Sequence, residues 1–228
     1  MKPVDPAKAV VLGLDTVSAD GGVALLILAG RPLTRELGER GRHAEALVPE
    51  ALALMTEAGI GWGDLDLIAV NVGPGSFTGI RIGLAAALGI HSATGTPAAG
   101  VGCLDIVARA CYDATSPAVG SYIVCAADVR RSEVVLAGFR VEGDGPVRLD
   151  GDRLTATAQA GTAPEGATLA GDGAALLWPD AALARWAPSG AERAVAAARL
   201  GLAAWARGEA EPPAPRYARG ADARPRVR

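Results

Sequence analysis

The segment GPGSFTGIR, residues 73–81, most constrains the fold of this chain because it joins two kinds of hydrophobic pattern. Before it, LDLIAVNV at 65–72 is an almost unbroken apolar run, which is typical of a strand buried on both faces. After it, residues 80–94 are rich in alanine and glycine and favour a helix. A glycine-rich strand-to-helix turn gathers backbone N–H groups at a helix N-terminus, where they attract phosphate or carboxylate.

Two interpretations of this turn stay open. It lacks the lysine of a P-loop and the spacing of a dinucleotide fingerprint, so neither motif applies. In the first interpretation, Gly73, Gly75 and Ser76 bind a nucleotide phosphate together with Asp15 and Thr16, which follow an apolar run, and Asp15 holds a hydrated Mg²⁺. In the second, the glycines serve only close packing, and Asp15 accepts hydrogen bonds from its own turn.

The hydrophobic pattern predicts an α/β fold with two lobes. In the first lobe it predicts strands at 9–15, 21–30, about 31–37, 65–72 and 97–101, and helices at 42–58, 80–94 and 103–113. This order indicates a mixed five-stranded sheet flanked by helices. In the second half it predicts strands at 121–127, 133–140, 146–149 and 167–171 and a helix at 191–207. We therefore expect a first lobe at 1–115, a reduced second lobe at 116–210 and a flexible basic tail at 211–228.

Charge and cysteine content limit the function. The net charge of −3 argues against a nucleic-acid binder that relies on bulk electrostatics. Residues 214–228 carry five arginines against one acid, which indicates a solvated tail or, alternatively, a phosphate-seeking arm. Three cysteines without a CxxC pair favour a reducing compartment. The start of the chain does not read as a signal peptide, and no apolar run approaches the length of a membrane span, so we expect a cytoplasmic protein.

Neither a metal centre nor a nucleophilic triad is predicted. The two histidines, His43 and His91, lie in different predicted helices and form no paired metal-binding motif. Ser76 lies in GPGSFTG, whose spacing differs from that of a nucleophile elbow. Cys103 and Cys111 lie on an apolar helix, where packed thiols are expected. We therefore assign no catalytic residue and no metal ligand.

Several segments together resemble one bacterial family. LGLDTVSADGGVALL, RHAEALVPEALALM and LDLIAVNVGPGSFTGIRIGLAAALGI look like the opening of the TsaB (YeaZ) family, and ADVRRSEVVLAGF, LAGDGA and PRYARG are similar to its later segments. The resemblance covers most of the chain and is densest at 10–110. It implies a degenerate member of the actin-like ATPase superfamily (ASKHA, ribonuclease H-like fold).

The resemblance also implies a function. Members of this family act as non-catalytic scaffold and activator subunits in the threonylcarbamoylation of the adenosine that adjoins the tRNA anticodon. Their partners are the paralogue TsaD, which carries the metal and catalyses the transfer, and the ATPase TsaE. Members of the family contact tRNA only indirectly, through the complex. Where TsaD has a His-x-x-x-His metal pair, this chain has Cys103 and Val107. The resemblance implies no cofactor and leaves nucleotide binding open.

The same resemblance places the partner interface on the helix at 42–58 and the helix that follows GPGSFTG, which can also self-pair into a homodimer when TsaD is absent. The candidate interface residues are His43, Leu47, Ala51, Leu54, Ala58, Gly83, Ala86, Ala87 and Ile90. Two alternative functions stay open. An ATP-dependent small-molecule kinase would share the fold, and a glycoprotease-like peptidase is an activity that has been ascribed to relatives of TsaD. The kinase requires an intact second lobe with its own phosphate loop, and the peptidase requires a metal pair or an activated nucleophile.

Overall fold

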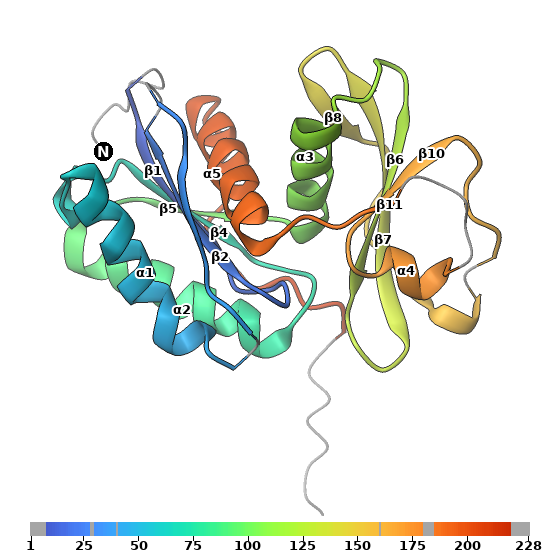
Figure 1. Ribbon diagram of the computed structural model, residues 1–228, viewed down its shortest axis with the longest axis horizontal. Helices are drawn as coiled ribbons and strands as arrows, with labels where there is room; N and C mark the ends of the chain where they lie inside the picture. The colour runs from blue at the N-terminus through green and yellow to red at the C-terminus, as the bar shows by residue number, and fades with distance from the viewer. Residues whose placement is uncertain (1–7, 28–29, 40, 160, 180–184, 220–228) are drawn as a thin grey trace, which may run out of the picture.

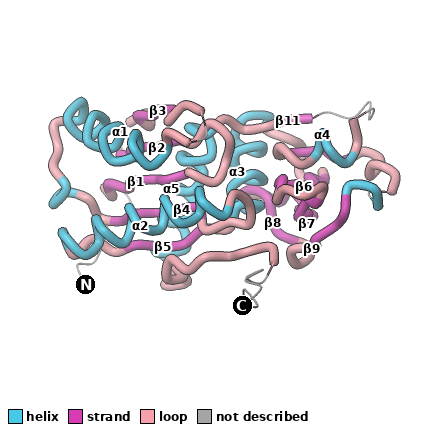
Figure 2. Tube along the Cα trace, turned by 90° about the horizontal axis from the view of Figure 1, so that it is seen from below, coloured by secondary structure: helices cyan, strands magenta, loops and turns pink. Residues whose placement is uncertain are grey.

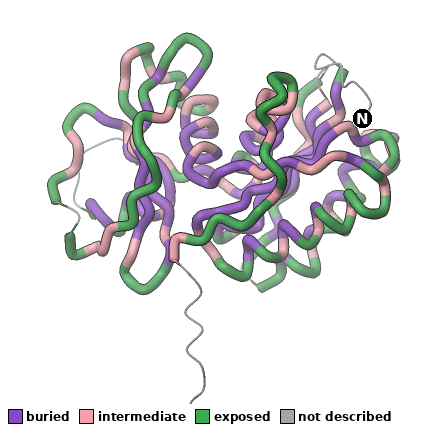
Figure 3. Tube along the Cα trace, turned by 180° about the vertical axis from the view of Figure 1, so that it is seen from behind, coloured by how far each residue is buried: buried purple, intermediate pink, exposed green. Residues whose placement is uncertain are grey.

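The computed structural model describes residues 8–27, 30–39, 41–159, 161–179 and 185–219. Two β-sheets stand side by side, with helices between them and on their outer faces (Figure 1). The buried residues concentrate in the sheets and on the helix sides that face them (Figure 3).

The first sheet has five strands in the spatial order β3-β2-β1-β4-β5. They are β1 (Val10–Asp15), β2 (Gly22–Ile27), β3 (Leu33–Glu36), β4 (Leu67–Asn71) and β5 (Ala98–Val101). The pairs β1–β2 and β2–β3 are antiparallel, whereas β1–β4 and β4–β5 are parallel. The predicted mixed five-stranded sheet is therefore confirmed.

The second sheet has six strands. They are β6 (Tyr122–Asp128), β7 (Glu133–Glu142), β8 (Gly145–Arg148), β9 (Arg153–Ala156), β10 (Ala167–Ala170) and β11 (Arg185–Trp186). Their order is β11-β10-β6-β7-β8, and β9 also pairs with β7. As in the first sheet, one central strand has an antiparallel neighbour, β7, and a parallel neighbour, β10. The second lobe is thus reduced in its helices. Its sheet is not reduced.

The helices form layers around the two sheets. They are α1 (His43–Ala58), α2 (Phe77–Thr94), α3 (Cys103–Thr115), α4 (Ala174–Leu177) and α5 (Gly190–Ala206), with 3₁₀ turns η1 (Trp62–Asp64) and η2 (Thr157–Gln159). Helices α1 and α2 cover the outer face of the first sheet, α5 and α3 lie side by side between the sheets, and α4 covers the outer face of the second sheet (Figure 1).

Helix α5 corrects the predicted lobe boundary, because it follows the second sheet in sequence but packs on the first. Its side chains Ala196, Ala197 and Leu202 share a buried cluster with Val11 and Leu67 of the first sheet. Such close packing needs small groups: a Cβ atom on Gly13 would lie 2.1 Å from the carbonyl oxygen of Ala194. Helix α3, in turn, packs on β6, β7 and β8 of the second sheet. The lobes are therefore not the contiguous segments 1–115 and 116–210.

The C-terminal segment corrects the prediction of a flexible tail from residue 211. Glu211 bridges to Gly100 on β5, and the amide N–H of Arg216 donates to the carbonyl of Val72, 2.8 Å away. Arg219 then reaches the second lobe, where its guanidinium donates to the carbonyl of Val129 (2.8 Å). Figure 2 shows this segment running beside β5 toward the second sheet. Residues 211–219 are thus a strap across both lobes; residues 220–228 lie outside the described residues.

Candidate functional site

The turn after β1 is built around Asp15, whose side chain is fully buried. Its carboxylate accepts hydrogen bonds from the Val17 amide (3.1 Å), the Ser18 hydroxyl (2.5 Å) and the Asn71 side-chain amide (2.7 Å). Asn71 ends β4, and the oxygen of its side-chain amide accepts a hydrogen bond from the Gly73 backbone amide (3.0 Å). The acid therefore ties the β1–β2 turn to the start of the GPGSFTG loop, as a buried carboxylate with satisfied hydrogen bonds does.

The GPGSFTG loop packs directly on that turn. A Cβ atom on Gly79 would lie 2.0 Å from the carbonyl oxygen of Thr16, and one on Gly75 would lie 2.3 Å from a methyl of Val17. The Thr16 hydroxyl is buried and donates to the Gly79 carbonyl (2.6 Å). Ser76 caps α2, since its hydroxyl accepts from the Gly79 amide (3.2 Å).

The structure thus brings all five predicted phosphate-site residues together at one junction of β1, β4 and α2. Their contacts support the packing interpretation of the glycines and the Asx-turn interpretation of Asp15. A carboxylate with three internal hydrogen bonds and no exposed surface is poorly placed to hold a hydrated cation. The binding of a nucleotide by these residues stays a prediction.

Cys103 and Arg193 meet where α3 and α5 face each other. Both side chains are buried, and the Arg193 guanidinium donates to the Cys103 sulfur (3.8 Å) and to the Pro188 carbonyl (3.3 Å). Burial raises the pKa of the Cys103 thiol to about 12, although the nearby Arg193 charge opposes this shift. The thiol is therefore protonated at neutral pH and is neither a nucleophile nor a metal ligand in this state.

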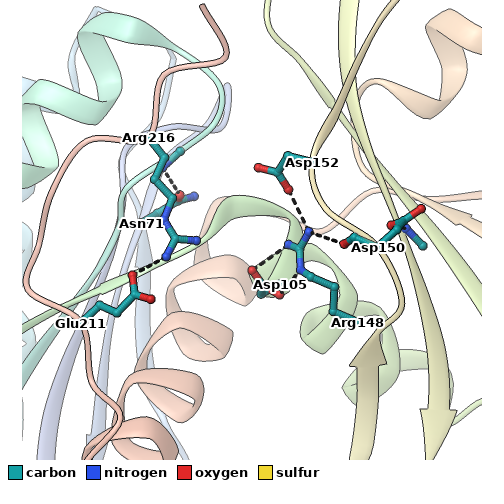
Figure 4. Close-up of polar contacts among 9 residues, drawn as sticks. Asn71, Asp105, Arg148, Asp150, Asp152, Glu211 and Arg216 are labelled. Atoms are coloured by element: carbon teal, nitrogen blue, oxygen red, sulfur yellow. Dashed lines mark hydrogen bonds and ion pairs between the residues drawn. The ribbon is translucent and has the colours of Figure 1, made fainter.

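Charged side chains also pair within the strap and, separately, between β8 and α3. Arg216 pairs with Glu211 (2.5 Å), whereas Arg148 on β8 pairs with Asp105 of α3 and with Asp152 (2.8 Å each). Figure 4 shows the two groups, with their dashed contacts staying within each group. Across the described residues, no cluster of three or more His, Cys, Asp or Glu side chains is arranged to hold a metal ion.

The predicted partner interface needs a correction, because much of it is buried inside the first lobe. Helices α1 and α2 turn most of the predicted residues toward their own sheet, so these cannot touch a partner: His43, Leu47, Ala51 and Leu54 on α1, and Gly83 and Ala87 on α2. The ring nitrogens of His43 lie 3.3 Å from the Thr16 carbonyl and 3.2 Å from that of Gly38, which gives this residue a structural role. Ala58, Ala86 and Ile90 are half-buried.

The outward sides of α1 and α2 nevertheless carry apolar groups. On α1, Val48 is 44% exposed and Leu52 is 49% exposed; on α2, Leu88 is 46% exposed. Ala85 and Gly89 are also exposed on α2. The two helices lie side by side on one face of the sheet (Figure 1). We call the five residues Val48, Leu52, Ala85, Leu88 and Gly89 the outer helix surface.

An aromatic cluster at the start of α2 was missed by the sequence reasoning. Phe77 is 50% exposed, Tyr217 of the strap stacks on it, and the Arg81 guanidinium lies over its ring at 3.9 Å. The segments that contain these residues, GPGSFTGIR and PRYARG, both belong to the family resemblance, but nothing in the sequence pairs them. Only the path of the strap brings them together.

Comparison with known proteins identifies the class and then the family. Two mixed sheets with matching strand orders and helices between them place the chain in the actin-like ATPase superfamily. The family model described as tRNA N6-adenosine threonylcarbamoyltransferase (TsaD) matches residues 39–204. The chain belongs to this family, in its TsaB/YeaZ group.

The relatives support this placement. An uncharacterized protein of Mycobacterium tuberculosis is 39% identical over 132 residues, which cover 56% of this chain and 58% of that protein. The tRNA threonylcarbamoyladenosine biosynthesis protein TsaB of Haemophilus influenzae is 31% identical over 124 residues, 54% of this chain and 51% of that protein. The chain thus spans between half and three fifths of the length of these relatives.

A solved structure is similar over almost the whole chain. YeaZ from Pseudomonas aeruginosa superposes with a TM-score of 0.75 and 26% identity, covering 90% of this chain and 96% of that one. Within the described residues, no helix has both the length and the apolar character needed to cross a bilayer.

Proposed function

We propose that this chain is a non-catalytic scaffold and activator subunit in the threonylcarbamoylation of the adenosine next to the tRNA anticodon. It acts in the cytoplasm with a TsaD-like paralogue, which performs the transfer, and a TsaE-like ATPase. Support comes from the matched family and from the relative named as a tRNA threonylcarbamoyladenosine biosynthesis protein.

The main support for a non-catalytic role is the identity of two residues at the start of α3. Cys103 and Val107 stand where the resemblance places the metal-binding pair of TsaD, and both are buried. Valine has no donor atom, and a thiol whose pKa is about 12 is protonated at neutral pH. The transferase metal therefore has no ligand pair in this position.

The two alternative functions gain no support from the described residues. A kinase needs an accessible carboxylate between its lobes, whereas Asp15 is fully buried and hydrogen-bonded within its own turn. A peptidase needs a nucleophile with a base within hydrogen-bond reach, and Ser76 instead caps α2. We therefore do not propose either activity.

The outer helix surface is the proposed binding site for the TsaD-like paralogue. A patch of exposed Val, Leu, Ala and Gly side chains on two adjacent helices is suited to another pair of helices, because the small residues allow close approach. In a paralogue with the same fold, the matching helices would form a pseudo-symmetric bundle. Without that partner, the same surface can pair two copies of this chain.

The test is a calorimetric titration of the chain with a TsaD-like protein from the same source, combined with tRNA modification in vitro. We expect a complex of fixed stoichiometry, and threonylcarbamoylation that needs this chain although the chain alone transfers nothing. Modification that proceeds at full rate without the chain, or an absence of binding, would show that the proposal is wrong. ATP turnover by the chain alone that Asp15→Ala abolishes would instead support the kinase alternative.

A further inference from the structure

The outward side of α2 carries a continuous stripe that ends at the strap. Phe77, Arg81, Ala85 and Leu88 are spaced by four, four and three residues, so they lie one above another along one side of the helix. All four side chains are exposed. Ala85 and Leu88 belong to the outer helix surface. Phe77 and Arg81 therefore continue that surface by about two turns toward the N-terminus of α2.

The strap adds a second ring beside this stripe. The ring of Tyr217 lies 4.9 Å from that of Phe77 and is 38% exposed, and its hydroxyl accepts from Arg81 Nε–H (3.3 Å). We call these three residues the aromatic cluster. Figure 2 looks onto this face of the molecule and shows α1, α2 and the strap in succession across it. The aromatic cluster and the outer helix surface are therefore parts of one face.

Helix α2 carries almost no charge. Arg81 is the only Asp, Glu, Lys or Arg within it. The Arg81 guanidinium lies over the Phe77 ring at 3.9 Å, and no carboxylate of the described residues lies within ion-pair distance of it. Helix α3, by contrast, has three charged side chains, and each of them is ion-paired. Arg81 thus keeps its charge for an acid supplied by another molecule.

The composition of this face favours a protein over a nucleic acid. Aromatic residues and arginine are enriched at the centre of protein interfaces, where other charged residues are depleted. An RNA site instead needs several cations that are free to meet phosphates. Here Arg216, the neighbour of Tyr217, already pairs with Glu211 (2.5 Å), which leaves Arg81 as the unpaired cation of the aromatic cluster.

We propose that the aromatic cluster is part of the binding site for the TsaD-like paralogue, so that the strap enters the interface, and that a carboxylate of the paralogue pairs with Arg81. The identity of the partner rests on the proposed function. The outer helix surface alone is small and aliphatic, whereas the cluster adds two rings and a charge, the kinds of side chain that dominate the affinity of an interface. An Arg81–carboxylate pair would also fix the register of the two subunits.

A first experiment measures whether the cluster is covered in the complex. Hydroxyl-radical footprinting with mass spectrometry compares the full chain alone with its complex with the TsaD-like protein. Phe77 and Tyr217 are exposed enough to react in the free chain. We expect their oxidation to fall about threefold or more in the complex, because residues that anchor an interface are desolvated. Tyr122, which is 51% exposed on β6, is the internal control and should react equally in both samples.

A second experiment is a calorimetric titration of variants with the TsaD-like protein. Arg81→Glu should weaken binding about 100-fold, because it places a like charge opposite the partner's carboxylate. Arg81→Gln should weaken it roughly tenfold and make the Kd less sensitive to salt. The matched controls are Arg140→Glu and Tyr122→Ala, since these two exposed residues lie opposite each other on β7 and β6 of the second lobe. Both controls should bind as the wild type does.

Three further variants separate a partner contact from a role in anchoring the strap. Tyr217→Ala removes the ring and should lower the affinity roughly tenfold, whereas Tyr217→Phe keeps the ring and should stay within about threefold of the wild type. Arg219→Gln loosens the strap at the second lobe but keeps the aromatic cluster, so it should bind normally. Hydrogen exchange of the Gly100 amide, which donates to the Glu211 carbonyl (2.9 Å), reports whether the strap stays on β5 in each variant.

The inference is overturned if both rings react as fast in the complex as in the free chain, or if Arg81→Glu binds the TsaD-like protein with wild-type affinity. Cluster variants that impair only self-association, or only the binding of tRNA, would assign the cluster to a homodimer contact or to RNA and would overturn it as well. Failure of the proposed function is a different result: the wild-type chain does not bind the TsaD-like protein at all, and the inference then fails with it.

Discussion

Tyr217 stacks on Phe77, with 4.9 Å between the ring centroids and 35° between the ring planes. Arg81 completes the contact, because its guanidinium lies over the Phe77 ring and its Nε–H donates to the Tyr217 hydroxyl (3.3 Å). Two residues further along the chain, Arg219 holds the β6–β7 turn. The strap therefore joins the first turn of α2 in one lobe to a hairpin in the other.

We predict that Arg219→Gln loosens the second-lobe hairpin without unfolding the protein. The substitution removes the hydrogen bond to the Val129 carbonyl and the ion pair with Glu133, and we expect a loss of about 1 kcal/mol in stability. Hydrogen exchange of the amides at 128–134 should accelerate. The control is Arg207→Gln, whose exposed side chain pairs with Glu209, two residues further on, and should change little. Equal exchange in both variants would show that the strap does not hold this hairpin.

We predict that Leu52→Glu or Leu88→Glu prevents binding of the TsaD-like partner while the monomer stays folded. Each side chain is about half exposed in the free chain, so glutamate is tolerated there but would be buried without a counter-charge in the complex. We expect affinity to fall by several kcal/mol in a calorimetric titration. Leu176→Glu, at 48% exposure on α4, is the matched control. Normal binding by both test variants would place the interface elsewhere.

We predict opposite effects for two glycine substitutions in the same helix. Gly79→Ala would place a Cβ atom 2.0 Å from the Thr16 carbonyl oxygen, so we expect a loss of about 2–4 kcal/mol in the free energy of unfolding. Gly89→Ala meets no atom within 4 Å and should gain about 0.5–1 kcal/mol from helix propensity. Urea denaturation measures both. A similar stability for Gly79→Ala and wild type would mean that the loop does not depend on this close approach.

We predict that alkaline pH destabilises the protein through its buried thiols. Burial raises the pKa of Cys103 to about 12, from the usual value of 9.0 in the unfolded chain. Above pH 9 the unfolded chain releases this proton while the folded chain keeps it. Stability is therefore unaffected below pH 9 and falls between pH 9 and 12 by about 1.4 kcal/mol per pH unit for each such thiol.

The measurement is a urea denaturation series at pH 8 to 10.5. Cys103→Ala should show a shallower decline than the wild type, although it is less stable at neutral pH. Cys111 and Cys125, whose thiol pKa values are also raised by burial, should account for part of the remaining slope. An identical pH slope for Cys103→Ala and wild type would exclude Cys103 as a source.

The first lobe could be predicted from the sequence because its signals are local. The apolar runs that became β1 and β4 are buried on both faces, and helical spacing located α1. The same spacing shows that the stripe containing Leu47 is apolar, but it does not show whether this stripe packs on the sheet or contacts a partner. Val48 and Leu52, next to that stripe, are the ones that face outward, and only the position of the sheet decides this.

The site depended on contacts between distant residues, which periodicity does not report. Asp15 and Asn71 are 56 positions apart, and Arg81 and Tyr217 are 136 positions apart. The turn between β6 and β7 has a visible signal, since RRS follows a predicted strand, but its left-handed backbone has none, because no glycine marks it. The sequence of the strap predicts a solvated tail, because arginines and prolines are also typical of disordered ends.

The position of α5 has a consequence for synthesis on the ribosome. The inner face of the first sheet stays uncovered until residues 190–206 have been made, although its last strand ends at Val101. At roughly 5–20 residues per second, that interval lasts about 5–20 s. During it, β1, β2 and β4 expose an apolar face that chaperones or neighbouring nascent chains can bind. The last strand of the second lobe, β11, ends at Trp186, so the strands of that lobe are synthesised before α5 completes the first.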